Sequence, residues 1–227
     1  MAIDQALLED TGRTGRAFLR LYRWSPPCLS LGRNEPALAR YDRVAIARLG
    51  LDVVRRPTGG RAVWHEHEVT YAAIAPIPWF GSLRESYHRI HERLAAALRS
   101  LGVEAVIASE GPAVRQPESP AACFASAVGG EVLAAGGKVI GSAQVRCGGA
   151  FLQHGSILLD GSQEVIRAIS RQPSHAGGGT TLSAVLGRSV SFGEVAAAVV
   201  AAWGEPLAPS VCPTVRPSGG DAWTWRR

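Results

Sequence analysis

The alternation of apolar and polar residues along the chain predicts a mixture of strands and amphipathic helices. In residues 82–101 the apolar side chains Ile90, Leu94 and Leu98 recur at helical spacing, with arginines and histidines between them. Short runs rich in β-branched residues, bounded by turn residues, predict strands. The predicted helices are 2–9, 42–49, 82–101, 164–170 and 192–203, and the predicted strands are 19–22, 29–31, 52–55, Val63, 69–74, 103–107, 131–134, 138–144 and 151–159.

Glycine pairs separate the last three predicted strands. Such turns are typical of hairpins, so this part of the sheet is expected to be antiparallel. We therefore predict an α/β (α+β) fold in which a mixed, largely antiparallel sheet packs with helices. The sequence contains no internal repeat and no linker. We expect a single domain over 1–205, followed by a loose, proline-rich tail over 206–227.

The composition is that of an ordinary globular protein, with 46% hydrophobic and 19% charged residues. The net charge of +5 raises the question of nucleic acid, but the arginines are scattered and form no basic helix. We expect acidic protein partners and no nucleic acid. The N-terminus lacks a secretory signal, and no apolar stretch reaches the roughly 18 residues of a membrane span, so no membrane association is expected.

Four cysteines, Cys28, Cys123, Cys147 and Cys212, lie far apart in the sequence. They form no Cys-x-x-Cys pair and do not cluster with histidines. This spacing predicts reduced thiols in a cytoplasmic protein, with neither a disulfide framework nor a metal site. One of the thiols could still serve as a nucleophile.

Lys138 is the only lysine among 24 basic residues; the others are arginines. An ammonium group is a compact charge whose pKa shifts readily on burial, whereas a guanidinium is planar, forked and permanently charged. The exception at Lys138 therefore suggests a site that needs ammonium chemistry or shape. A chance surface lysine is the alternative.

The first candidate motif is the Gly59-Gly60 turn, which follows Arg55, Arg56 and Thr58. Glycines allow backbone amides to approach a ligand, and arginines can neutralise a carboxylate or phosphate. The pattern is not a P-loop, because the lysine and hydroxyl that end that motif are missing. A plain hairpin turn explains it equally well.

A second motif runs from Lys138 through small residues to His154 and Gly155. Small residues on a strand leave room for a ligand against the backbone. His154 is either a ligand-binding group or a satisfied core histidine. Cys123 is a third candidate, since a nearby cation could activate its thiol, although a lone cysteine is more often a small buried residue.

The segments RRPTGGRAVWHEHEVTYA (55–72) and GGKVIGSAQVRCGGAFLQHGSILL (136–159) resemble the lipoate–protein ligase A and octanoyl transferase family. The pattern of that family is RRxTGGGAVxHD, then GKKxxGSAQ, then QHGSLL. MAIDQALLE (1–9), LRLYRWSPPCLSLGRNE (19–35) and TTLSAVLGRSVSFGEVAAAVVAAW (180–203) resemble its remaining segments. The resemblance covers about nine-tenths of the chain, and it implies a catalytic domain of the biotin/lipoate protein ligase type.

By position, the resemblance implies substrate-binding roles for Arg55, Arg56, Thr58, Gly59, Gly60, His65, Gly141, Ser142, Gln144, His154 and Gly155. Lys138 matches the essential lysine of the family. Cys123 lies in an Ala-Cys-Phe context like that of Gram-positive-type octanoyl transferases, where the thiol forms an acyl-enzyme. Enteric-type transferases instead place their cysteine after the His-Gly strand, and residues 166–182 contain none.

The resemblance thus implies a cofactor-independent octanoyl transferase with Cys123 and Lys138 as its catalytic residues. The donor would be octanoyl-acyl carrier protein, and the acceptor a lipoyl domain or a glycine-cleavage H-type carrier. The alternatives are an ATP-dependent lipoate–protein ligase, a lipoyl amidotransferase between carriers, and a non-catalytic acyl-binding homologue.

There are departures from the family pattern. Arg61 replaces the third glycine of the family's TGGG run. We expect no accessory C-terminal domain of the kind found in long ligases, and the resemblance suggests a strand preceding Met1.

Overall fold

The computed structural model describes residues 1–108, 130–172, 179–210, 212 and 224–225. Its helices are α1 (Ala2–Thr14), α2 (Ala37–Arg40), α3 (Arg43–Arg48), a 3-10 turn η1 (Ile77–Trp79), α4 (Leu83–Ser100), α5 (Glu164–Ile169), α6 (Leu182–Leu186) and α7 (Phe192–Ala201). Its strands are β1 (Phe18–Tyr22), β2 (Cys28–Leu31), β3 (Asp52–Arg55), β4 (Val63–His65), β5 (Glu68–Pro76), β6 (Val106–Ile107), β7 (Val132–Ala134), β8 (Gly137–Cys147) and β9 (Ala150–Leu158).

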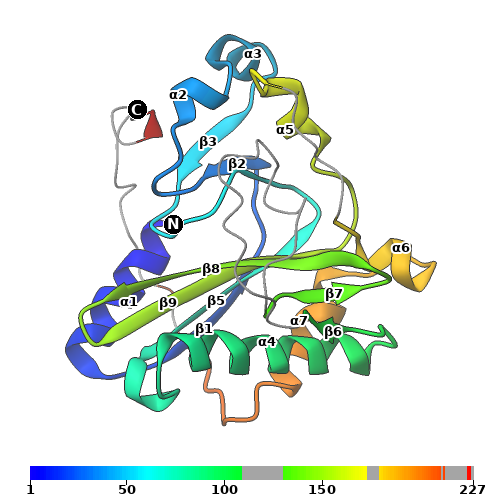
Figure 1. The fold of residues 1–227 in the computed structure, drawn as a ribbon. Coiled ribbons are helices and arrows are strands. Elements are labelled where there is room, and N and C mark those ends of the chain that lie inside the picture. Colours follow the sequence, from blue (N-terminus) through cyan, green and yellow to red (C-terminus); the bar gives the residue numbers. More distant parts are fainter. Residues whose placement is uncertain (109–129, 173–178, 211, 213–223, 226–227) are drawn as a thin grey trace.

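A six-stranded sheet forms the centre of the molecule (Figure 1). Its strand order is β1-β5-β9-β8-β7-β6, and every neighbouring pair is antiparallel. The Gly136-Gly137 and Gly148-Gly149 pairs lie at the turns that connect β7 to β8 and β8 to β9. The predicted fold class and the predicted glycine hairpins are therefore confirmed.

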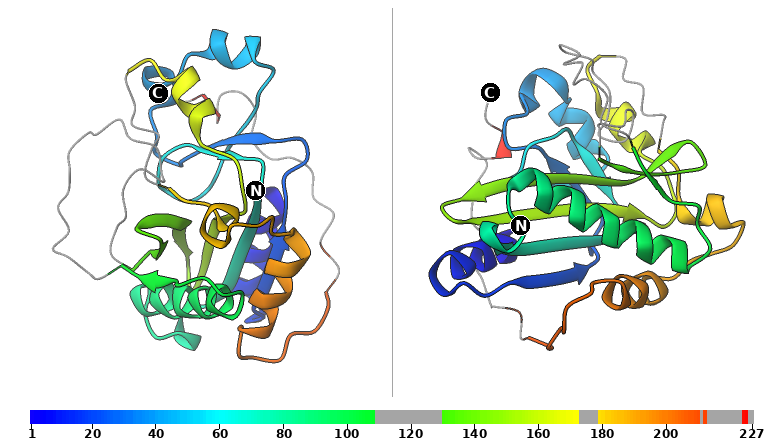
Figure 2. Two further views of the ribbon diagram at one scale, coloured as in Figure 1. Left: turned by 90° about the vertical axis from the view of Figure 1, so that its right-hand side faces the viewer. Right: turned by 60° about the horizontal axis from the view of Figure 1, so that its bottom comes forward.

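Helices cover both faces of this sheet. Alternate residues of β5 point in opposite directions: Tyr71 and Ala73 join the core under α4 and α7, while Ala72 and Ile74 pack against α1. The long helix α4 runs across the sheet in the second view of Figure 2. The face that carries α1 is also the face on which the second sheet lies (Figure 1).

The second sheet has three strands in the order β3-β2-β4, with β2 parallel to β3 and antiparallel to β4. Together with α2, α3 and α5 it encloses a separate core that contains Leu29, Leu31 and Trp64 (Figure 1). The sequence predicted these strands but assigned them to one sheet with the others. Hydrophobic patterning marks a strand without naming its partner, and β2 and β3 become parallel because α2 and α3 connect them.

Polar caps fix several helix boundaries. Ser82 and Glu85 form a reciprocal capping box at the start of α4, and the Asp42 side chain accepts hydrogen bonds from the first amides of α3. Helix α1 extends beyond the predicted residue 9 and ends at Gly15, whose φ of 70° suits a left-handed helix terminus. The predicted strand 103–107 is shorter than expected, and α2 and α6 were not predicted.

Residues 224 and 225 contact the second sheet and its helices. The Thr224 carbonyl accepts hydrogen bonds from Nε and Nη2 of Arg55 at 3.1 and 2.9 Å, and Arg43 lies over the Trp225 ring at 4.6 Å. These two residues are thus in contact with the folded domain, and a loose tail over 206–227 stays a prediction. No helix in the described part of the chain is long and apolar enough to span a membrane.

Candidate active site

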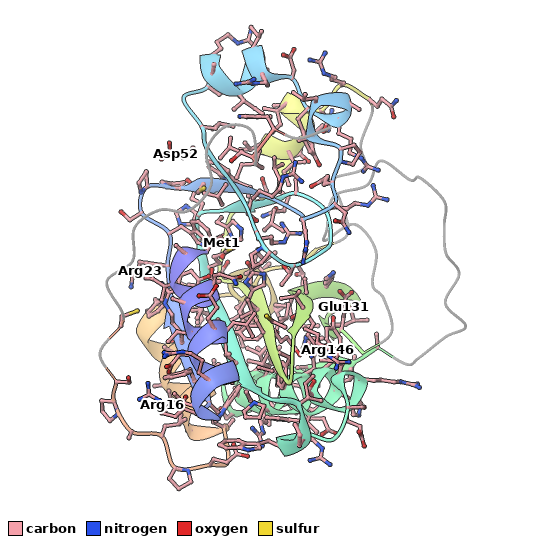
Figure 3. The ribbon with its side chains drawn as sticks, turned by 90° about the vertical axis from the view of Figure 1, so that its left-hand side faces the viewer. Met1, Arg16, Arg23, Asp52, Glu131 and Arg146 are labelled. Carbon is pink, nitrogen blue, oxygen red and sulfur yellow. The ribbon has the colours of Figure 1, made fainter. Side chains whose placement is uncertain are left out.

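A cavity of about 30 Å³ lies between the two sheets. One wall comes from the three-stranded sheet and its loops, and the other from strands β5, β8 and β9; Met1, at the start of α1, also borders it (Figure 3). The lining residues are Met1, Ser30, Arg56, Val63, His65, Thr70, Gly141, Ser142, Ala143, His154 and Gly155. Six predicted binding residues, Arg56, His65, Gly141, Ser142, His154 and Gly155, therefore border one cavity.

His65 is fixed by hydrogen bonds at both ring nitrogens. Its Nδ1 lies 2.7 Å from Oε1 of Glu68, and its Nε2 lies 2.6 Å from Oγ of Ser30. Glu68 also accepts hydrogen bonds from the hydroxyls of Thr70 and Ser156. The carboxylate thus holds the imidazole in one orientation against the cavity.

An aromatic contact closes the outer side of His65. The Trp24 ring stacks on the imidazole with a centroid separation of 4.5 Å, and its indole N–H donates to the Thr70 hydroxyl at 3.0 Å. His65 is consequently held by a stacked ring as well as by its hydrogen bonds, and only 5% of its surface is exposed.

His154 lies on the opposite wall and connects the two sheets. Its Nε2 lies 2.6 Å from Oγ1 of Thr58, and its Nδ1 faces Oδ2 of Asp4 at 3.6 Å. Asp4 also accepts hydrogen bonds from Arg20 at 2.7 Å and from Tyr22 at 3.0 Å. Burial lowers the pKa of His154, so the imidazole is neutral. Burial alone would raise the pKa of Asp4, but His154 and nearby positive charge outweigh it and lower this pKa to about 2.

The two predicted arginines of the glycine loop bind backbone carbonyls. Arg55 donates to the carbonyls of Gly32 and Glu35, and Arg56 to those of Ser30 and Gly59. Both side chains are buried. These contacts shape the loop itself, and binding of a substrate anion by either arginine stays a prediction.

Gly60 has a φ of 89°, and its carbonyl lies against Gly32 so closely that a Cβ at position 32 would be 1.8 Å from the oxygen. The glycine turn is thus packed backbone-to-backbone against the end of β2.

Ser142, Gly155 and Tyr71 lie side by side across β8, β9 and β5. The Ser142 hydroxyl bonds Tyr71 at 2.6 Å and His91 of α4 at 2.7 Å, so it points toward the α4 face of the sheet. A Cβ at Gly155 would lie 2.3 Å from the Gly141 carbonyl oxygen and 2.9 Å from the Tyr71 ring. The absence of a side chain at Gly155 therefore leaves the space that the Gly141 carbonyl and the Tyr71 ring occupy.

Gln144 does not border the cavity. Its side-chain amide donates to Ser86 of α4 at 2.8 Å and to Gln153 at 3.3 Å, on the same side of the sheet as Ser142. Among the described contacts it stabilises the packing of α4, and a direct role in substrate binding stays a prediction.

Lys138 is the second residue of β8 and is 3% exposed. Its Nζ lies 2.6 Å from Oε1 of Glu131, which is also buried. Figure 3 shows Glu131 away from Met1, near the edge of the large sheet. Cys123 lies outside the described residues, so its separation from Lys138 stays a prediction. Cys147 is exposed at the end of the β8 strand.

Sequence reasoning did not find Asp4, Ser30, Glu68, Tyr71 or His91, although each hydrogen-bonds a predicted site residue or, for Asp4, faces one. Their positions in predicted helices and strands gave no sign of a polar role. The only available signal was a polar residue at a position where the pattern requires burial, such as Asp4 on the apolar side of α1.

Comparison with known proteins identifies the family. A profile of the lipoyl protein ligase A/B catalytic domain matches residues 1–204, which is nearly the whole described fold. The chain belongs to this family.

Curated relatives of this family member share more than a third of its residues over most of its length. Octanoyltransferase LipM of Moorella thermoacetica is 43% identical over 182 residues, which are 78% of this chain and 66% of that protein. Octanoyltransferase LipM of Symbiobacterium thermophilum is 36% identical over 231 residues, or 94% of this chain and 83% of that protein. The chain thus spans slightly less than two thirds of the Moorella protein.

Solved structures of lipoate–protein ligases share the fold. Lipoate-protein ligase A bound with ATP superposes with a TM-score of 0.73 at 22% identity, covering 89% of this chain and 77% of that one. A bi-partite archaeal lipoate protein ligase from Thermoplasma acidophilum gives a TM-score of 0.66 at 21% identity, covering 89% and 75%. At these identities the likeness establishes the fold.

Proposed function

We propose that this protein is an octanoyl transferase of lipoate biosynthesis. In this proposal it takes octanoyl from octanoyl-acyl carrier protein and passes it to the lysine of a lipoyl domain or an H-type carrier. The observation that carries the proposal is the 36–43% identity to proteins named octanoyltransferase over most of the chain. The cavity between the sheets, bordered by six motif residues, supports it.

The proposed first step is a thioester exchange at Cys123. The Cys123 thiolate attacks the carbonyl carbon of the donor thioester, a new carbon–sulfur bond forms, and the carrier thiolate leaves with the electron pair of the broken bond. One thioester replaces another, so the step needs positioning and charge stabilisation and no ATP.

Lys138 would supply that charge. Its ammonium group is held by Glu131 at 2.6 Å in a buried environment, where a charge acts more strongly than in water. We propose that it stabilises the thiolate before attack and the negative oxygen of the tetrahedral intermediate during attack. The charge of Glu131 is part of this arrangement, because an isolated buried ammonium would be costly.

The second step is the attack of an acceptor lysine amine on the Cys123 thioester. An amide bond forms, the cysteine thiolate leaves, and the ammonium proton of the intermediate returns to the thiolate or to solvent. Carriers of acyl groups with acidic surfaces would suit a chain of net charge +5. A cytoplasmic location and a single domain over 1–205 belong to the same proposal.

The test is turnover without nucleotide. Purified protein is incubated with octanoyl-acyl carrier protein and a lipoyl domain, and octanoylated domain is measured by mass spectrometry. The proposal expects product without ATP. Product that requires free octanoate and ATP, with release of pyrophosphate, would identify a ligase. Transfer only from an octanoylated H-type carrier would identify an amidotransferase, and binding without turnover would identify a non-catalytic homologue.

A further inference from the structure

Thr58 and His154 form a direct hydrogen bond across the candidate active site. Thr58 lies in the loop between β3 and β4 of the small sheet, and His154 lies on β9 of the large sheet. The 2.6 Å contact between Oγ1 and Nε2 therefore ties the small sheet to the large sheet beside the cavity that His154 borders. Thr58 is fully buried and His154 is 4% exposed, so water does not compete for this bond.

The direction of this hydrogen bond follows from Asp4. A carboxylate is only an acceptor, so the single N–H of a neutral imidazole points from Nδ1 toward Asp4. Nε2 is then the bare nitrogen, and the Thr58 hydroxyl donates to it. The 3.6 Å separation of Nδ1 and Asp4 Oδ2 is longer than a hydrogen bond. Nδ1 has no hydrogen-bond partner among the described residues, and it faces the Asp4 carboxylate. Burial keeps the pKa of His154 low, which agrees with one N–H.

Asp4 is itself rigidly placed. Arg20 and Tyr22 of β1 both donate to its carboxylate, and no part of the side chain is exposed. On the other side, the Thr58 carbonyl accepts a hydrogen bond from the Arg33 amide at 2.8 Å. The series Asp4–His154–Thr58 thus connects α1, the large sheet and the glycine loop.

The cavity beside this series is small and open on one side. A volume of about 30 Å³ accommodates roughly one water molecule, and an eight-carbon acyl chain needs several times more. An acyl chain inserted fully between the two sheets would therefore have to move them apart, and the Thr58–His154 contact that joins the sheets resists this movement.

We propose that the Asp4–His154–Thr58 series limits the opening of the cavity and thereby determines which acyl chain lengths the protein accepts. Thr58 and His154 form the clasp, and Asp4 is a positioning residue that acts through His154. The inference rests on the proposed acyl transfer and adds a chain-length determinant to it. In a cavity that opens freely, each additional buried methylene would raise the affinity for the acyl chain roughly fourfold.

The test compares octanoyl and dodecanoyl thioesters as acyl donors. In Thr58→Val the hydroxyl is replaced by a methyl group of similar size, and the ratio of dodecanoyl to octanoyl transfer should rise by at least about tenfold. Thr58→Ser keeps the hydroxyl and should keep the wild-type ratio. Asp4→Asn should shift the ratio in the same direction by a smaller factor.

Thr11→Val is the matched control. Thr11 is also buried, but its hydroxyl has no hydrogen-bond partner in the described part of the chain, so the ratio should not change. An unchanged ratio in folded Thr58→Val, or an equal shift in Thr58→Ser, would overturn the proposal.

A binding measurement separates this inference from the proposed function. Octanoate and dodecanoate are titrated into wild type and Thr58→Val by calorimetry, with circular dichroism as a check of folding. If wild type transfers no acyl group but the variant gains relative affinity for dodecanoate, the result contradicts the proposed acyl transfer and supports the role of the clasp in chain-length selection. If wild type transfers octanoyl but the variant changes neither the transfer ratio nor the binding ratio of the two chain lengths, the result supports acyl transfer and contradicts the role of the clasp.

Discussion

The Nζ atom of Lys138 lies 2.6 Å from Oε1 of Glu131, and the two side chains are 3% and 4% exposed. A buried ion pair contributes little net stability, but removing one partner leaves an uncompensated charge inside the protein. This asymmetry makes the pair sensitive to substitution at either end.

Glu131→Gln should lower the free energy of unfolding by about 3 kcal/mol, because the buried ammonium loses its counter-charge. Urea denaturation measures the change. The exposed pair formed by Arg188 and Glu194 at 2.6 Å is the control, and Glu194→Gln should change the free energy of unfolding far less than Glu131→Gln. Equal effects at the two sites would show that burial of the Lys138 pair has no energetic consequence.

Lys138→Arg should reduce octanoyl transfer by roughly a hundredfold or more, because a forked guanidinium does not fit the slot of a compact ammonium although it keeps the charge. Transfer rates at saturating donor provide the measurement, and the melting temperature checks folding. Full activity in a folded Lys138→Arg protein would contradict the role given to the ammonium shape.

Gly155→Ala should destabilise the protein by about 2 kcal/mol or more, because the new Cβ would collide with the Gly141 carbonyl and the Tyr71 ring. Gly149 lies at the nearby hairpin turn, and a Cβ at this position would meet no atom within 4 Å, so Gly149→Ala is the matched control. Thermal unfolding of both variants checks the prediction. Equal melting temperatures of Gly155→Ala and Gly149→Ala would contradict it.

His91 should make stability depend on pH. Burial lowers its pKa from 6.5 to about 3, so the unfolded chain binds a proton between these values and the folded protein does not. Stability should therefore fall below pH 6.5 by up to about 1.4 kcal/mol per pH unit. The difference between wild type and His91→Gln isolates this contribution.

His88 lies on the same helix but is half exposed, beside Glu92, so His88→Gln is the control for His91→Gln. Urea denaturation of the three proteins between pH 6.5 and 4.5 should show a shallower pH dependence for His91→Gln alone. Parallel curves for wild type and His91→Gln would rule out a neutral buried imidazole.

Much of the fold could be predicted because its local signals are strong. Helix α4 has a clear apolar stripe and a capping box, and the glycine pairs mark the β7–β8 and β8–β9 turns. The separation into two sheets was not predictable, because strand pairing depends on contacts between residues far apart in sequence.

The residues of the candidate site, like the fold, could be predicted only in part from the sequence. The motif residues His65 and His154 could be predicted to share a cavity, since the family resemblance covers both segments. Their partners Glu68, Ser30 and Asp4 could not, because a polar residue inside a strand or helix becomes meaningful only when the fold supplies its neighbour. Arg55 and Arg56 suggested anion binding, whereas the structure shows them bound to carbonyls of the protein itself.

The most direct test of the proposed mechanism is the location of the acyl group. The protein is incubated with octanoyl-acyl carrier protein without ATP, and peptide mass spectrometry then locates any octanoyl adduct. We expect one adduct, on Cys123, which disappears in Cys123→Ala and persists in a Cys147→Ser variant at the exposed cysteine. An adduct that persists in Cys123→Ala, or transfer to the lipoyl domain at the wild-type rate by that variant, would contradict the central claim.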